Sequence, residues 1–288
     1  MKEYILYKLG QLIVIILPLR AAYRLGGFLS FFYYHFLRKA EREILKENLR
    51  TVFPEWSEKK IRKCARRNFR EFGRFLAEFF YITRISEKNI GKLCRIKNFH
   101  NIEKAAGYGK GVIALGAHIG NWELGSVALS LSGCPINIIA LDHKSRKVND
   151  LFINQRKSRG VRVISATKGT REIFKVLQRG EFFTILGDRD VTSGGMEVDF
   201  FGKPAVFPRG APALCYRTGA PILIGMMVKD ASGRYNLIMH EPVTADYSLG
   251  QEEGERKLLT EWVGVFEEYV RAYPEYWFMY HRVWEDKK

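Results

Sequence analysis

The 288-residue sequence has only four cysteines and no CxxC pair. The four lie far apart, and no histidine stands at ligand spacing from any of them. This argues against both a zinc site and a disulfide framework. We therefore predict that Cys64, Cys94, Cys134 and Cys215 are small core residues of a protein from a reducing compartment. Nothing in the sequence calls for a metal or another cofactor.

The sequence also lacks an apolar run of the ~20 residues that a membrane-spanning helix needs. The uncharged N-terminal stretches are Leu9–Leu19 and Leu25–Leu37, with Arg20 and Arg24 between them, and no signal-peptide cleavage site follows. We expect two short apolar helices, broken near Pro18, that anchor the chain in a membrane interface. A tilted span with snorkelling basic residues and a pair of core helices remain alternatives.

Acidic residues are scarce, since 31 of them face 47 lysines and arginines and leave a net charge of +16. Residues 1–84 hold 18 basic and 8 acidic side chains and so supply +10 of that excess. Basic residues interleaved with large apolar ones favour an anionic membrane surface as partner over nucleic acid. A merely solvated basic face is the alternative.

Internal repeats and low-complexity tracts are absent, and the hydrophobic pattern changes once along the chain. The first ninety or so residues have helical periodicity, after which short apolar runs alternate with helical segments. That alternation predicts a mostly parallel sheet flanked by helices, with an antiparallel hairpin near its end. The expected strands are 112–115, 136–140, 161–164, 182–186, 222–228 and 235–240, and the expected helices are 122–132, 147–159, 170–178, 209–218 and 252–272.

The loop after the first of these strands reads Gly-Ala-His-Ile-Gly-Asn-Trp-Glu over residues 116–123. Ligands of open α/β sheets bind beyond the carboxyl ends of the strands, where His118 falls. Asn121 can cap the following helix and Glu123 lies in its first turn. We predict that Glu123 orients His118, which then serves as a general base. A capping or core histidine is the alternative.

His-x4-acid at a strand–helix junction resembles the signature of glycerolipid-type acyltransferases, and its Asn-Trp-Glu form resembles the late acyltransferases of lipid A biosynthesis. Two further blocks in matching order strengthen the resemblance. Residues 187–190 with 200–205 are similar to the family's second block, and residues 274–282 to its C-terminal block. The resemblance extends from the apolar N-terminus to about residue 284 and implies a glycerolipid acyltransferase-like α/β fold.

The resemblance implies transfer of a fatty acyl chain from a thioester, on acyl carrier protein or coenzyme A, to a hydroxyl of a glycolipid. A lipid A precursor at the cytoplasmic face of a bacterial inner membrane is the expected acceptor. His118 would deprotonate the hydroxyl, and the alkoxide would attack the thioester directly. The absence of a Gly-x-Ser-x-Gly motif is consistent with a route without an acyl-enzyme.

Further substrate contacts are predicted around this loop. Arg156 and Arg159 are candidates for gripping a phosphate. Lys144 or Arg146 would replace an Arg-Pro pair that family members often carry after the second strand. Solvent-exposed arginines are the alternative. The predicted substrate-binding residues are Asn121 and six charged residues: Lys144, Arg146, Arg156, Arg159, Asp188 and Arg189. Asp188 and Arg189 could equally form a structural ion pair.

We divide the chain into an apolar membrane anchor (1–37), a basic helical segment packed on the catalytic domain (38–94) and an α/β acyltransferase domain (95–288). Two rival functions remain open. One is an acyltransferase of the same fold acting on a lysophospholipid or a phosphoinositide mannoside. The other is a non-enzymatic basic protein that binds membranes or RNA, although no RNA-binding signature accompanies the charge.

Overall fold

A seven-stranded sheet forms the centre of the protein, in a computed structural model that describes residues 2–166, 169–190 and 194–284. Its strand order is β1-β9-β8-β2-β5-β3-β4, and only the β8–β9 pair is antiparallel. The mostly parallel sheet and its hairpin are thus confirmed. The strands are β1 Cys94–Lys97, β2 Val112–Gly116, β3 Ile136–Ala140, β4 Arg162–Ser165, β5 Phe182–Leu186, β8 Ile222–Lys229 and β9 Tyr235–Met239.

Helices cover both faces of the sheet, and the alternation of side chains along a strand explains why. In β2, Val112 and Ala114 join one hydrophobic cluster while Ile113 and Leu115 join the other. A strand buried on both sides must be apolar at every position. One cluster includes residues of α6 (His100–Ala106) and α7 (Trp122–Leu131) and contacts α8 (Arg146–Lys157). The other includes α9 (Thr170–Gln178), α10 (Gly210–Thr218) and α11 (Gln251–Ala272).

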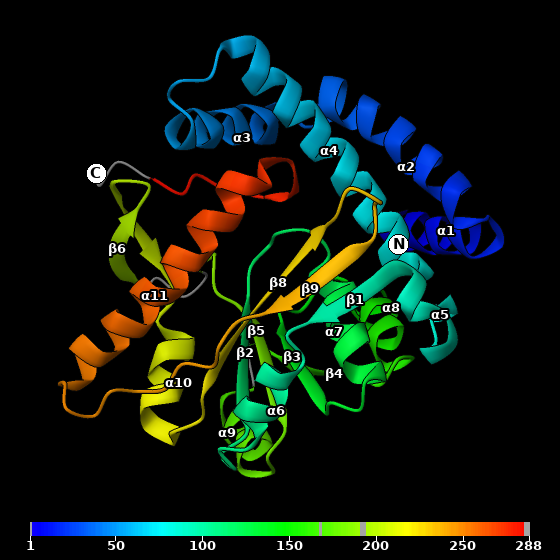
Figure 1. The fold of residues 1–288 in the computed structure, drawn as a ribbon. Coiled ribbons are helices and arrows are strands. Elements are labelled where there is room, and N and C mark those ends of the chain that lie inside the picture. Colours follow the sequence, from blue (N-terminus) through cyan, green and yellow to red (C-terminus); the bar gives the residue numbers. More distant parts are fainter. Residues whose placement is uncertain (1, 167–168, 191–193, 285–288) are drawn as a thin grey trace.

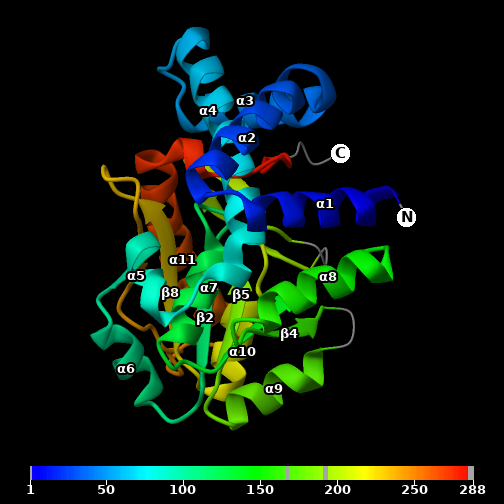
Figure 2. The ribbon, with the colours of Figure 1, turned by 90° about the vertical axis from the view of Figure 1, so that its right-hand side faces the viewer.

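The N-terminal helices gather at one end of the molecule, opposite α6 and α9, as Figures 1 and 2 show. They are α1 (Lys2–Ile16), α2 (Leu19–Phe32) with a π-helical turn (Tyr33–Leu37), α3 (Lys39–Val52) and α4 (Glu58–Tyr81). The predicted break at Pro18 is confirmed. The short helix α5 (Glu87–Leu93) leads from them into β1. In the described part of the chain, no helix combines the length and the apolar character needed to cross a membrane.

Two glycines hold α2 and α4 close together. A Cβ atom on Gly26 would lie 2.6 Å from the carbonyl oxygen of Gly73, and one on Gly73 would lie 2.5 Å from that of Gly26. Backbones that approach this closely leave no room for a side chain at either position. The apolar helix α2 is therefore fixed against α4.

Two expectations about elements were wrong. Residues 94–97 form a strand, β1, that extends the sheet beyond β9 and is missing from the expected strands. Between Asp190 and Pro208, where no strand was expected, lies the hairpin β6 (Met196–Phe200) and β7 (Lys203–Phe207). Residues 191–193 of that region lie outside the described residues. Phe200 is fully buried and stacks on Phe266, so it packs the core.

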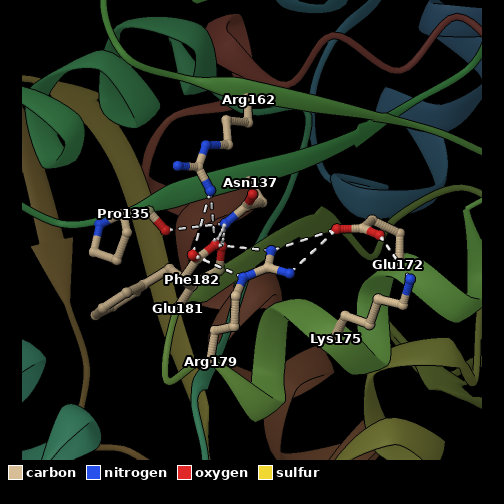
Figure 3. Close-up of polar contacts among 8 residues, drawn as sticks. All are labelled: Pro135, Asn137, Arg162, Glu172, Lys175, Arg179, Glu181 and Phe182. Carbon is tan, nitrogen blue, oxygen red and sulfur yellow. Dashed lines mark hydrogen bonds and ion pairs between the residues drawn. The ribbon is translucent and has the colours of Figure 1, made fainter.

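A cluster of charged residues gathers at the amino ends of the strands, away from the loop that carries His118 (Figure 3). Glu181, which precedes β5, accepts hydrogen bonds from Arg179 at 2.9 Å and from Asn137 at 2.9 Å. Arg162 and Glu172 complete the network. Because each charge here has a partner of opposite sign, the cluster ties the strands together and leaves no charge for a ligand.

Candidate active site

The loop between β2 and α7 is held rigidly by its own sequence. Gly120 has φ +63°, and a Cβ there would lie 1.6 Å from the carbonyl oxygen of Met227, so only glycine fits. Asn121 is the N-cap of α7, where its Oδ1 accepts from Leu124 N at 2.9 Å while its amide donates to Glu78 at 2.6 Å. The predicted cap is therefore confirmed, and because Asn121 is 1% exposed the structure gives no support to its predicted substrate contact.

His118 is held by Asp188, at the end of β5. Its Nδ1 lies 2.8 Å from one carboxylate oxygen and its backbone N–H donates to the other at 3.1 Å. The Asp188 side chain has no exposed surface, whereas the imidazole is 20% exposed. Burial opposes ionisation of Asp188, but the neighbouring His118 and Arg189 outweigh it and hold the pKa of this carboxyl below its ordinary value.

An ionised Asp188 can only accept hydrogen bonds, so it selects the neutral tautomer with the proton on Nδ1 and the lone pair on Nε2. Within the described part of the chain, no group hydrogen-bonds Nε2. The imidazole is therefore in the tautomer that a general base requires, with its basic nitrogen free to meet a ligand.

Glu123 does not contact His118 and instead forms a two-bonded ion pair with Arg156. The Nε–Oε2 and Nη2–Oε1 distances are 3.0 and 2.6 Å, and both side chains are largely buried. The structure therefore does not bring Glu123 to His118; the ring next to the imidazole is that of Trp122, with centroids 4.9 Å apart. The guanidinium of Arg156 is likewise occupied, so the structure gives no support to a phosphate contact there.

The C-terminal block closes the loop from the other side. Phe278 N donates to the carbonyl of His118, and Gly120 N donates to that of Tyr276, each at 3.0 Å. Arg189 Nη2 donates to the carbonyl of Phe278 at 2.5 Å. Burial is the main cause that lowers the pKa of Arg189, against the opposing charge of Asp188. Asp188 and Arg189, both predicted to bind substrate, thus hold the residues around His118 in place.

Helix α4 supports the same block through two buried or half-buried contacts. Asn68 donates to the carbonyl of Trp277 at 2.7 Å and accepts from the hydroxyl of Tyr280 at 2.8 Å. Phe75 of α4 stacks beside Trp122 with ring centroids 4.4 Å apart. The ring of Trp122, with Phe75 and Phe278 behind it, therefore borders His118 on one side.

A second buried carboxylate, Glu78, links the loop to the N-terminal helices. Besides Asn121, it accepts from the hydroxyls of Tyr23 at 2.6 Å and Tyr235 at 2.8 Å. Lys229 Nζ lies 3.3 Å from it. Four partners satisfy this charge, which otherwise would be costly to bury.

The remaining predicted residues lie elsewhere. Arg159 donates to the carbonyls of Ile82 and Thr83 and thereby joins α8 to the end of α4, so its predicted phosphate contact has no support. Lys144 and Arg146 are exposed in the segment after β3, and Arg146 makes only a loose ion pair of 3.9 Å. Their substrate contacts stay predictions. The described residues contain no group of three acidic, histidine or cysteine side chains that could hold a metal.

Sequence reasoning missed the pairing of His118 with Asp188, although the strands carry a signal for it. Gly116 of β2 and Leu186 of β5 are register partners in neighbouring parallel strands. His118 and Asp188 each follow two residues later, at the same edge of the sheet. The pKa of His281 is lowered by burial and by the charges of Arg189 and His118.

Comparison with known proteins agrees with this geometry. The sequence profile of a family described as bacterial lipid A biosynthesis acyltransferase matches residues 2–286. The chain belongs to that family.

Relatives of this family member include phosphatidylinositol mannoside acyltransferases and lipid A biosynthesis acyltransferases. A phosphatidylinositol mannoside acyltransferase of Mycobacterium tuberculosis (strain ATCC 25618 / H37Rv) is 29% identical over 66% of this chain and 62% of its own length. A lipid A biosynthesis palmitoleoyltransferase of Escherichia coli (strain K12) is 24% identical over 68% of this chain and 64% of its own length. The chain therefore matches somewhat under two thirds of the length of these relatives.

Proposed function

We propose that the protein transfers an acyl group from a thioester to a hydroxyl of a membrane glycolipid, with His118 as general base. The observation that carries the proposal is the 2.8 Å contact of His118 Nδ1 with Asp188, which leaves Nε2 without a hydrogen-bond partner among the described residues, at the carboxyl edge of the sheet. Family membership supports an O-acyltransferase reaction. Asp188 takes the orienting role that the sequence suggested for Glu123.

One base is enough for the reaction, because the proton that it takes from the acceptor is returned to the leaving group. Nε2 takes the proton of the acceptor hydroxyl, and the oxygen attacks the thioester carbonyl to form a tetrahedral intermediate. When the C–S bond breaks, the imidazolium returns the proton to the leaving thiolate. Asp188 stabilises the transient imidazolium charge without itself taking the proton. Products are an ester and a free thiol, on acyl carrier protein or coenzyme A.

The acceptor we propose is a phosphorylated glycolipid, either a lipid A precursor or a phosphatidylinositol mannoside. Both names occur among the relatives, and the higher identities belong to the mannoside enzymes. Lys144 and Arg146 remain the proposed phosphate contacts, since their side chains are exposed. The half-buried ring of Trp122, backed by the buried Phe75 and Phe278, is the apolar surface beside His118 that we propose for an acyl chain.

We further propose that α1 and α2 dock on the cytoplasmic face of a bacterial inner membrane. Of the eighteen large apolar side chains exposed in the described residues, thirteen lie between residues 5 and 37. An apolar surface this concentrated marks a contact site. Because residues 1–84, which include these two helices, supply +10 of the net charge of +16, an anionic bilayer surface is the proposed partner.

The test is transfer of radiolabelled acyl groups from acyl carrier protein or coenzyme A to each of the two acceptors. His118→Ala should lower transfer by ~10²–10⁴-fold, the usual span for losing a general base. His100→Ala, in exposed α6, is the matched control and should transfer normally. Undiminished transfer by the His118 variant would show that the mechanism is wrong. Absence of transfer by the wild type to either lipid, from either donor, would overturn the proposed substrates.

A further inference from the structure

A cavity of about 340 Å³ lies apart from His118, between the start of α2, the end of α4, α5 and the turn that joins β8 to β9. A water molecule takes about 30 Å³ of the liquid, so the space holds on the order of ten waters and suits a small polar headgroup. His118 and Asp188 are not among its lining residues. A ligand held here is therefore not the one that reacts.

Three cations from three different elements line the cavity. Arg20 comes from α2, Lys92 from α5, and Arg234 from the turn directly before β9. Within the described part of the chain, none of them pairs with a carboxylate; Arg234 donates only to the carbonyl of Gly91, at 3.3 Å. The cavity therefore carries three positive charges that the protein does not neutralise.

The one carboxylate on the cavity wall does not cancel them. Glu78 is 3% exposed and is occupied by Tyr23, Asn121, Tyr235 and the ammonium of Lys229, at 2.6 to 3.3 Å. Its negative charge is offset by that lysine before any ligand arrives. An incoming anion thus meets Arg20, Lys92 and Arg234 as unpaired donors.

The position of the cavity indicates the kind of anion. Arg20 begins the helix whose later residues include the exposed Phe28 and Phe31, and the exposed Ile16 lies just before Leu19 on the cavity wall. Cations beside an exposed apolar surface are the arrangement that binds lipid headgroups while acyl chains meet the apolar side. A free anion in solution would gain nothing from that surface.

We propose that this cavity binds the phosphate of an anionic phospholipid headgroup, with Arg20, Lys92 and Arg234 as its ligands. The proposal rests on the membrane docking of α1 and α2 argued above. The bound lipid is neither donor nor acceptor. It anchors the protein beside the bilayer that supplies its acceptor.

The test compares two triple variants of equal net charge. Arg20→Gln/Lys92→Gln/Arg234→Gln removes the site, and Lys110→Gln/Arg171→Gln/Arg217→Gln removes three exposed cations at the opposite end of the molecule. Binding is measured by sedimentation with phosphatidylcholine vesicles with and without phosphatidylglycerol. We expect the site variant to bind anionic vesicles at least about tenfold more weakly than the control variant, since each cation near a bilayer contributes roughly 1 kcal/mol. Equal losses would overturn the proposal, because net charge alone would then explain binding.

A second arm separates a lipid from a free anion as the source of the phosphate. Inorganic phosphate and glycerol 3-phosphate are titrated calorimetrically against the wild type and both variants. Weak binding of glycerol 3-phosphate that is lost only in the site variant supports the proposal. Phosphate binding at this site without any difference between the variants on vesicles would assign it to a soluble anion. Acyl transfer in detergent micelles should be normal in both variants, so failure of this proposal is distinguishable from failure of the proposed reaction.

Discussion

The imidazole of His118 takes its orientation from a carboxylate 70 residues further along the chain. The nearer carboxylate, Glu123, is five residues away but belongs to an ion pair with Arg156. Proximity in sequence was therefore a poor guide to which acid serves the base, whereas strand register was a good one.

Replacement of each carboxylate should separate these roles. Asp188→Asn should reduce acyl transfer by ~10²–10⁴-fold, because the tautomer and the charge of the imidazole are no longer controlled. Glu123→Gln should instead lower the free energy of unfolding by about 3 kcal/mol, since it strands a buried guanidinium. Transfer rates and urea unfolding curves of both variants provide the comparison. If Glu123→Gln lost transfer as severely as Asp188→Asn while keeping its stability, Glu123 would be the orienting acid after all.

The depressed pKa of Asp188 predicts a pH dependence of stability. The ordinary pKa of an aspartate is 3.8, and the folded value lies below it. Ionised Asp188 thus stabilises the fold fully above the unfolded pKa, and this contribution is lost as pH falls through the folded value. The difference in unfolding free energy between wild type and Asp188→Asn should stay constant down to about pH 5 and shrink below about pH 4. A difference that stays constant in acid would mean that Asp188 is not ionised in the fold.

The cysteines are predicted to differ in reactivity. Burial raises the pKa of Cys64 and Cys94 to about 12 and that of Cys215 to about 11, whereas Cys134 is partly exposed and raised less. Only thiolates react readily. At pH 8, one thiol should therefore react with Ellman's reagent in the native protein, and the other three only after unfolding. Peptide mapping that finds Cys64 or Cys94 modified first would contradict the burial described above.

At the scale of elements, the boundaries were largely predictable, because apolar runs of five residues and helical periodicity are local properties. The strand 136–140 and the helix 170–178 lie at the predicted residues. The strand β1 was missed because Cys94–Lys97 is short and mixed in polarity, and among the described strands it pairs with β9 alone. The contacts of Glu123 and Arg159 were not predictable either, since they depend on how α8 packs against α4 and α7.

The crossing of α2 and α4 gives a prediction at this scale. Alanine in place of a helical glycine ordinarily stabilises by about 1 kcal/mol, and Gly264→Ala on the open face of α11 should do so. Gly73→Ala should instead destabilise by about 1–3 kcal/mol, because its methyl group would meet the backbone of α2. Thermal unfolding of both variants makes the comparison. A gain in stability from Gly73→Ala would mean that the two helices can separate at little cost.

At the scale of the whole molecule, the exposed apolar surface of α2 should govern contact with bilayers. Phe28→Ser with Phe31→Ser should weaken sedimentation with anionic vesicles about tenfold or more, since each buried aromatic contributes ~1.5–3 kcal/mol. Val206→Ser with Tyr247→Ser changes comparably exposed side chains elsewhere and should leave sedimentation unchanged. Equal behaviour of the two pairs would remove α2 from the membrane contact.

The hydrogen bond from Asn68 to Trp277 joins residues 209 positions apart. Its two partners are therefore synthesised at different times. A ribosome adds about 5–20 residues per second, so on the order of ten seconds or more pass between the synthesis of the two partners. During that interval the apolar N-terminal helices are already made, while the loop around His118 still lacks the segment that closes it. With the membrane docking of α1 and α2 proposed above, a nascent chain would reach a bilayer before the loop around His118 is complete, and its activity would begin only there.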